Sequence, residues 1–349
     1  MPKTKIKFIV FLIFLLFCAN NAKSADLIEW NKTVVLENNP TSWARMVKLE
    51  NGDWLAAYAV FSDKEGSRIR VKKSSDRMRS WQLLTEFGEK GRNLDNANLI
   101  QLANGDVLLA MRSLIDKKSY RIQVYKSENS GKDFRFLSVI DSNENPENAG
   151  NVGVWEPFLI ELAPNKLAAF YANEKYSKSE PAFSQIISEK ISKDGGKTWG
   201  AEIRAVAEAG KSRPGEPNLV KLKSGKYVLY YEVCGSEDCA GHFSVSDDGE
   251  NWSGKIGSLI PNVFQNPQAI ALDEKFWLVT SNNAKILYTL DAGKTWKENE
   301  PAFKFSSWGA FYQTGKREVA LVTGTKNKKS ERNRLFIRFG EFNISKSFR

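Results

Sequence analysis

The sequence of 349 residues has little of the two residue types that most metal centres and many nucleophilic sites use. It contains one histidine and three cysteines. A single histidine argues against a zinc site and against histidine-based catalysis. Three cysteines are too few for a dense disulfide scaffold or a multi-cysteine metal centre. We therefore expect neither a metal ion nor another cofactor.

Long hydrophobic runs are also scarce, and the one that exists lies at the amino terminus. Three lysines within the first seven residues precede the apolar run Phe8–Ala19, and the small residues Ala22 and Ser24 follow it. This three-part pattern is typical of a secretory signal peptide. The run is shorter than the roughly 20 residues that span a membrane. We expect residues 1–24 to be removed and residues 25–349 to act, without a membrane anchor, in the periplasm or outside the cell.

The formal net charge of +10 does not indicate a nucleic-acid partner. Four lysines leave with residues 1–24, which lowers the net charge to +6, and the remaining basic residues are scattered. The sequence shows no nucleic-acid-binding motif, and export argues against such a partner. We interpret the charge as a solvated basic surface.

Two cysteines, Cys234 and Cys239, remain after that removal. They enclose four residues, Gly-Ser-Glu-Asp. In an oxidising compartment this spacing allows a disulfide without requiring one, and two free thiols are the alternative. We expect the disulfide.

One pattern recurs six times: an apolar strand, a tight polar turn and a second apolar strand. Pairs such as Asn51-Gly52 and Ser224-Gly225 are typical of hairpin turns. The six copies begin at Ala44, Ala97, Pro157, Pro217, Pro267 and Ala310.

A second motif, of the form Ser-x-Asp-x-Gly-x-x-Trp, follows five of these hairpins. In it the Ser and Asp side chains accept backbone N–H bonds, the glycine takes a positive φ, and the aromatic ring packs beneath the turn. In the fourth copy we assign Asp247 as the aspartate. The copies span Ser74–Trp81, Ser127–Phe134, Ser192–Trp199, Val245–Trp252 and Thr289–Trp296.

These repeats predict an all-β fold with one domain. A hairpin, a third strand, the turn and a fourth strand make one four-stranded unit, and such units in a ring make a β-propeller. Six hairpins predict six blades. The sixth unit lacks its last strand, and we expect the N-terminal segment 27–36 to complete it and close the ring.

The five turns resemble Asp-boxes, and the chain resembles the six-bladed sialidase-like propellers over nearly its whole length. The Asp-box is a structural motif, so the resemblance implies the fold and leaves the function open.

Strand direction predicts which side chains surround the central mouth: those just before the first strand or just after the second strand of each blade. They combine carboxylates, arginines and aromatic rings, which is the composition a carbohydrate-cleaving site needs. We expect this rim to hold Arg45, Asn96, Asn98, Arg112, Trp155, Glu156, Asn173, Arg213, Glu216, Tyr231, Glu232, Asn266, Gln268, Trp308 and Tyr312.

Three rim carboxylates compete for catalysis, and glycoside hydrolysis commonly uses two. Glu156 lies beside Trp155 at a strand start, where burial would raise its pKa and suit an acid. Glu232 follows two tyrosines in the neighbouring blade. We assign Glu156 and Glu232 as the pair, and give Glu216 a sugar-binding, arginine-holding or catalytic role.

The segments Trp-Glu-Pro-Phe-Leu (155–159), Arg-Pro-Gly (213–215) and Tyr-Tyr-Glu-Val-Cys-Gly (230–235) resemble glycoside hydrolase family 93. The resemblance implies a retaining exo-α-1,5-L-arabinanase that releases arabinobiose. It implies Glu156 and Glu232 as the catalytic pair and Tyr312 as an assisting residue.

Two other functions compete with this reading. A sialidase would grip a carboxylate with three arginines, for which Arg45, Arg112 and Arg213 are candidates, but the Arg-Ile-Pro motif is absent around Arg45. A non-catalytic propeller would bind glycan through its rim aromatic residues Trp155, Tyr231 and Trp308. For the favoured enzyme we expect a monomer whose partner is an oligo- or polysaccharide substrate. We expect six residues to bind this substrate: Arg45, Trp155, Arg213, Glu216, Tyr231 and Trp308.

Overall fold

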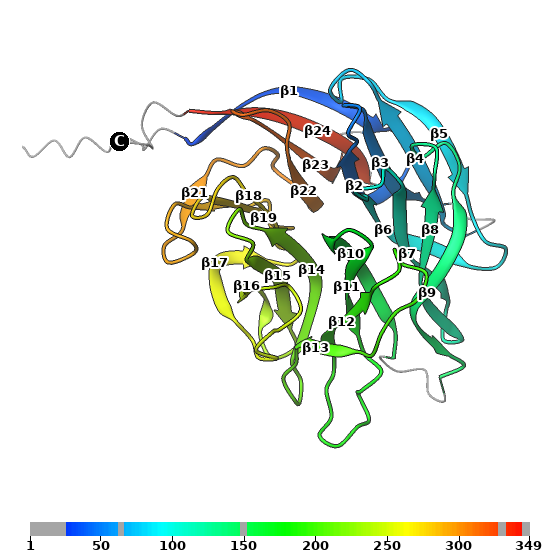
Figure 1. Ribbon diagram of the computed structural model, residues 1–349. Helices are drawn as coiled ribbons and strands as arrows, with labels where there is room; N and C mark the ends of the chain where they lie inside the picture. The colour runs from blue at the N-terminus through cyan, green and yellow to red at the C-terminus, as the bar shows by residue number, and fades with distance from the viewer. Residues whose placement is uncertain (1–25, 62–65, 147–151, 327–332, 344–349) are drawn as a thin grey trace, which may run out of the picture.

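The computed structural model describes residues 26–61, 66–146, 152–326 and 333–343. Within these residues the chain forms six four-stranded antiparallel sheets, which confirms the predicted all-β, six-bladed propeller. Figure 1 shows the sheets arranged around an axis, with their first strands nearest the centre. The expected signal peptide lies outside the described residues. Within them, no helix is long and apolar enough to cross a membrane.

Each blade runs from an inner to an outer strand. Blade one comprises β2 (Thr41–Lys48), β3 (Trp54–Val60), β4 (Arg68–Ser74) and β5 (Gln82–Phe87). Blade two comprises β6 (Asn93–Gln101), β7 (Val107–Ile115), β8 (Ser119–Ser127) and β9 (Arg135–Glu144). Blade three comprises β10 (Val154–Ala163), β11 (Lys166–Asn173), β12 (Ile186–Ser192) and β13 (Ile203–Val206).

The second half of the ring repeats this order. Blade four comprises β14 (Arg213–Lys221), β15 (Tyr227–Cys234), β16 (Asp238–Ser246) and β17 (Ser258–Phe264). Blade five comprises β18 (Gln268–Ala271), β19 (Trp277–Thr280), β20 (Ile286–Thr289) and β21 (Lys297–Asn299). Blade six comprises β22 (Ser307–Gln313), β23 (Glu318–Lys326), β24 (Asn333–Phe342) and β1 (Ile28–Glu37).

The hydrophobic core lies between neighbouring blades, so the middle strands are buried on both faces. Almost every residue of β3 is buried, for example. One cluster joins Leu55 of blade one to Leu109 of blade two, and another joins Phe170 of blade three to Leu229 of blade four. Apolar burial on both faces explains why these strands read as continuous hydrophobic runs in the sequence.

The Asp-box turns join the third strand to the fourth in blades one to five. In blade three, the Ser192 hydroxyl accepts the Gly196 N–H at 2.8 Å, and the Asp194 carboxylate accepts both the N–H and the hydroxyl of Thr198. The two bonds from Thr198 lower the pKa of Asp194 to about 2. Each turn is thus held by its own side chains.

The blade-four turn corrects the assignment of Asp247. That side chain is exposed and pairs with Lys226. Asp248 accepts the N–H groups that define the turn, and Ser246 accepts the Gly249 N–H at 2.9 Å. This turn has one residue fewer before its tryptophan than the blade-three turn, so counting back from Trp252 gives the wrong aspartate.

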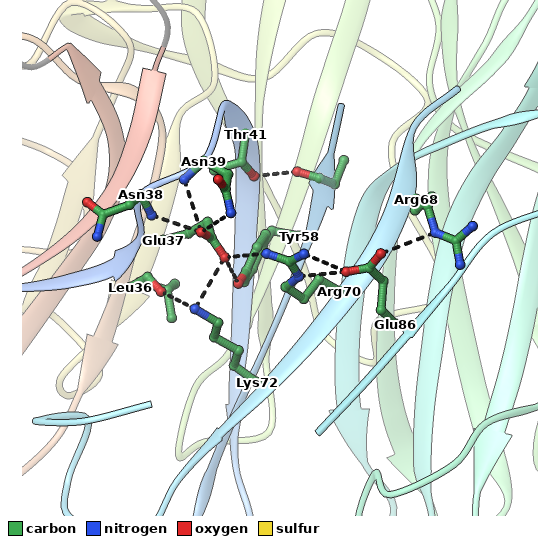
Figure 2. A network of polar contacts seen from close by, with 11 residues as sticks. Leu36, Glu37, Asn38, Asn39, Thr41, Tyr58, Arg68, Arg70, Lys72 and Glu86 are labelled. Carbon is green, nitrogen blue, oxygen red and sulfur yellow. Dashed lines mark hydrogen bonds and ion pairs between the residues drawn. The ribbon is translucent and has the colours of Figure 1, made fainter. Parts of the chain in front are cut away.

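The ring closes as predicted, because β1 pairs antiparallel with β24 in blade six. Figure 2 shows the polar network at this junction, centred on Glu37 at the end of β1. Glu37, only 4% exposed, accepts hydrogen bonds from Tyr58 and Arg70 of blade one, both at 2.8 Å, and from the Asn39 N–H, and it lies 3.2 Å from Lys72. One carboxylate therefore ties the closing strand to blade one.

Replacing Glu37 with glutamine tests this tie. Burial alone would raise the pKa of Glu37, but the bonds from Asn39, Arg70 and Tyr58 outweigh it and lower the pKa to about 2. A carboxylate with a depressed pKa stabilises the fold above its unfolded pKa, and that contribution is lost as pH falls from about 5 to about 2.

We expect Glu37→Gln to lower the free energy of unfolding by about 3 kcal/mol at pH 7. We also expect it to weaken the loss of stability below pH 5, in denaturant titrations followed by tryptophan fluorescence. Glu29→Gln, an exposed change on the same strand, is the control. Equal stability of the two variants at pH 7 would contradict the assigned tie.

Candidate active site

The innermost strands begin at one end of a central tunnel, which we call the mouth. A volume of about 440 Å³ lies along this tunnel, and its wall includes Arg45, Asn98, Phe158, Asn218, Gln268 and Tyr312. At the mouth, each blade has a non-glycine residue with a positive φ at the corresponding position, and Gln265 beside Asn266 has one as well. The six residues at the corresponding position are Trp43, Asn96, Glu156, Glu216, Asn266 and Trp308.

Five of these residues lie at a register shift in the pairing of the first and second strands. A bulge re-aims the side chain that it carries. In blades three and four the re-aimed side chains are carboxylates, Glu156 and Glu216. The third carboxylate, Glu232, lies at the mouth end of β15, where it pairs with Gly215.

Backbone N–H groups at the mouth hold two of the three carboxylates. Oε2 of Glu156 accepts the N–H of Glu216 at 2.8 Å, and Oε2 of Glu232 accepts the N–H of Asn266 at 2.8 Å. Glu216 is 7% exposed, and its Oε2 has no hydrogen-bond partner among the described residues. Blades three, four and five therefore meet at these three carboxyl groups.

Burial and like charge raise the pKa of this cluster. For Glu156, burial and the charge of Glu232 raise the pKa to about 7, against opposing effects of the Glu216 N–H and Arg112. Burial, followed by the charges of Glu156 and Glu232, raises the pKa of Glu216 well above its usual value. Neighbouring carboxyls with elevated pKa values are typical of sites that exchange protons.

The pKa of Glu232 is also raised by burial, while the Asn266 N–H and the charge of Arg213 act in the opposite direction. Among the three carboxyls, Glu232 thus has the surroundings that most favour its ionised form.

Each arginine at the mouth already has partners. Arg45 donates to the carbonyls of Ala44 and Trp308 and to Asn266 Oδ1. Arg112 pairs with Asp95 at 3.5 Å, and its guanidinium lies 5.1 Å from the ring centre of Trp155.

Arg213 pairs with Glu174, a residue that the sequence did not point to. Glu174 accepts hydrogen bonds from Arg213 at 2.5 Å, from the Trp155 indole at 2.9 Å and from the Gly153 N–H at 2.9 Å. It is almost fully buried. Glu174 therefore binds Trp155, which is the neighbour of Glu156, and Arg213, whose charge acts on Glu232. It connects the surroundings of these two glutamates.

The structure contains the disulfide between Cys234 and Cys239. Its Cys234 Sγ lies 3.3 Å from Oε1 of Glu232. These two cysteines and Glu232 form the only cluster of potential metal ligands found among the described residues. Because the disulfide uses both sulfurs, neither cysteine offers a thiolate.

The structure brings most of the predicted rim residues together, but it excludes Tyr231 from the mouth. Tyr231 is 0% exposed and packs with Phe170 in the core between blades three and four. Its hydroxyl lies 3.0 Å from the Ser244 hydroxyl and accepts the Gly257 N–H at 2.6 Å. The prediction that Tyr231 binds substrate is wrong, because consecutive residues of a strand face opposite sides.

Tyr312 lies in the tunnel wall, where it ties blade six to blade one. Its hydroxyl accepts the Met46 N–H at 2.7 Å, and Trp54 packs against its ring. The equivalent N–H groups of Leu159 and Ala269 are bound by Asn98 and Asn218. The hydroxyl also lies near the charge of Arg45, and the assisting catalytic role of Tyr312 stays a prediction.

Two carboxylates of the site, Asp95 and Glu174, were missed by the sequence analysis. Each lies directly beside a predicted rim residue, Asn96 and Asn173 respectively. Extending the rim by one residue at each strand end would have included both.

No protein-family model matches the chain, and no curated protein matches it. Among solved structures, an α-L-arabinanase of Penicillium chrysogenum in complex with arabinobiose is 22% identical, with a TM-score of 0.79, and the match covers 90% of this chain and 98% of the other. A family 93 α-L-arabinofuranosidase of Fusarium graminearum, also with arabinobiose, is 18% identical with a TM-score of 0.76, over 89% and 98% of the two chains.

A sialidase of Streptococcus pneumoniae is 11% identical, with a TM-score of 0.63, over 89% of this chain and 70% of the other. At these identities the comparisons establish the fold. The protein is a six-bladed propeller similar in structure to glycoside hydrolase family 93 enzymes and also to sialidases.

The cluster predicts a measurable coupling between two carboxyls. We expect Glu232→Gln to lower the pKa of Glu156 from about 7, because the substitution removes a negative charge that helps to raise it. Carbon-13 NMR of labelled glutamate side chains would follow the titration. Glu161→Gln, at the far end of the same strand β10, should leave this pKa unchanged. An unchanged pKa in Glu232→Gln would show that the two carboxyls do not interact.

Proposed function

We propose that the protein is a retaining glycoside hydrolase that acts on α-L-arabinan-type polysaccharide or a related neutral glycan. The observation that carries this proposal is the convergence of buried carboxyls at the mouth, one of which, Glu156, has a pKa raised to about 7. A group with this pKa keeps a proton to donate near neutral pH.

In the proposed reaction Glu156 is the acid/base and Glu232 is the nucleophile. The Glu232 carboxylate attacks the anomeric carbon, while Glu156 gives its proton to the glycosidic oxygen of the departing sugar. Because Oε2 of Glu156 accepts the Glu216 N–H, Oε1 is the oxygen assigned to carry that proton. A water molecule then attacks the glycosyl–enzyme, Glu156 takes its proton, and the ester bond to Glu232 breaks.

Charge balance at the mouth supports a neutral sugar. Five carboxyls face three guanidiniums there, namely Asp95, Glu156, Glu174, Glu216 and Glu232 against Arg45, Arg112 and Arg213. Arg112 and Arg213 are paired with carboxylates, and Arg45 binds backbone carbonyls. A sialic acid carboxylate would compete with these partners and meet the glutamates, which disfavours the sialidase alternative.

The proposed compartment is extracytoplasmic, after loss of residues 1–24. The disulfide between Cys234 and Cys239 supports this part of the proposal, because such bonds persist in oxidising compartments.

The purified protein lacking residues 1–24 should release arabinobiose from linear arabinan and no sialic acid from sialyl-lactose. Proton NMR of the first product should show the anomeric configuration of the substrate. We expect Glu156→Gln and Glu232→Gln each to lower the rate by about a hundred- to ten-thousandfold, since each removes a group that transfers a proton or attacks carbon.

Glu161→Gln is the matched control and should keep the wild-type rate. Binding of arabinan without cleavage would instead support a glycan-binding propeller. Release of sialic acid would support a sialidase, and an inverted product would exclude Glu232 as nucleophile.

Glu216 is expected to act as a neutral carboxyl, because burial and two like charges favour its protonated form. Glu216→Gln preserves shape and neutrality, so we expect it to keep the rate of cleavage within about tenfold, whereas Glu216→Ala should reduce it further. Initial rates on linear arabinan would compare the two. A loss in Glu216→Gln as large as that in Glu156→Gln or Glu232→Gln would make Glu216 a catalytic carboxylate.

A further inference from the structure

A second cleft opens on the mouth side of the ring, between blades five and six. Its volume is about 470 Å³, and residues 282–284 and 304–307 supply most of its wall. The first segment joins β19 to β20, and the second joins β21 to β22. Both connections lie at the mouth end, because β22 begins there and Asn299, the last residue of β21, pairs with Ile286 at the start of β20.

Phe305 projects an apolar ring into solvent at this cleft. Its exposed fraction, 69%, is the highest among the exposed large hydrophobic residues of the described chain. Exposing a ring of this size to water costs free energy unless a ligand covers it. Sugar rings have one apolar face of C–H groups, which suits stacking on an aromatic side chain.

The cleft also carries polar groups that suit hydroxyls. Asn282 uses Oδ1 to accept the Trp308 N–H at 2.5 Å, which leaves its Nδ2 hydrogens to donate elsewhere. Lys304 is exposed in the same wall, as is Asn283, whose amide also binds the Ser281 hydroxyl and the Asn262 carbonyl. An aromatic platform with a few convergent polar groups is the usual composition of a small-molecule site.

Trp308 makes the cleft continuous with the candidate active site. Its backbone N–H is bound by Asn282 in the cleft, and its indole faces the carboxyl of Glu216 in the mouth. Trp308 therefore separates the carboxylate cluster from the cleft by one residue. A glycan held at the glutamates and extended past Trp308 would meet Phe305 next.

We propose that this cleft is an accessory subsite for a further neutral sugar residue of the same oligosaccharide, with Phe305 as its stacking platform. The proposal rests on the function proposed above and adds a preference for longer chains. Its occupant is one pentose residue of the glycan, not a second molecule.

Isothermal titration calorimetry of arabinobiose and arabinotetraose with Glu232→Gln protein, which does not consume the ligand, tests the subsite. Adding Phe305→Ala should lower the ratio of tetraose affinity to biose affinity by about five- to tenfold, from the loss of one aromatic contact. Phe305→Trp should preserve the ratio. Phe136→Ala, which truncates a 56% exposed ring on the outer strand β9, should not change it.

An unchanged ratio in Phe305→Ala, with the parent protein active on arabinan, would overturn the subsite and leave the proposed function intact. An equal loss of affinity for arabinobiose and arabinotetraose would also overturn the subsite. The Phe305 ring would then act through Trp308 on the whole site. If the wild-type protein cleaves no arabino-oligosaccharide and Glu232→Gln binds none, the proposed function fails, and the proposed occupant with it.

Discussion

The arrangement of the mouth depends on one backbone constraint, a left-handed residue near the start of the innermost strand in every blade. Six non-glycine residues adopt this conformation, and each costs about 1–3 kcal/mol. Side chains bind four of the N–H groups at these positions: Asp95 binds Asn96, Glu156 binds Glu216, Glu232 binds Asn266, and Asn282 binds Trp308. The strain persists because those bonds and the cores between blades hold the strands in place.

The same constraint explains why carboxylates tolerate burial here. A buried carboxylate needs hydrogen-bond donors, and a strand that leaves its ladder at a bulge frees an N–H that points at the mouth. Glu156 takes one such N–H, that of Glu216, from the next blade, and Glu232 takes the N–H of Asn266, which precedes β18. Each therefore joins adjacent blades through one oxygen, and each is also a member of the proposed catalytic pair. This double use places the proposed catalytic pair at a junction between blades rather than on a loop.

Much of the fold could be predicted from the sequence, because the same hairpin and turn motifs recur along the chain and each copy supports the others. Six hairpins and five Asp-boxes set the number of blades, and the missing strand of the last unit predicted that 27–36 closes the ring. The register of one turn could not be read in this way, since the copy around Asp248 is one residue short. Alternation within a strand, had it been applied, would have separated Tyr231 from Glu232.

The interactions that cross between blades were out of reach of the sequence. Glu174 of blade three pairs with Arg213 of blade four, which is separated from it by 39 residues. Tyr312 meets Met46 across 266 residues. No local sequence pattern identifies such a pair, because the two partners lie far apart along the chain. The packing of neighbouring blades brings Glu174 to Arg213, and the closure of the ring brings Tyr312 to Met46.

Burial raises the pKa of all three carboxyls of the cluster, and their surroundings decide which of them favours the protonated form. Glu216 is the most enclosed and has two like-charged neighbours, so it favours the neutral form. Glu232 has the Asn266 N–H and the charge of Arg213, both of which favour the ionised form. Glu156 lies between these extremes, with a pKa raised to about 7. Three carboxyls of one residue type thereby differ in their tendency to hold a proton, because N–H groups and guanidiniums are unevenly distributed around them.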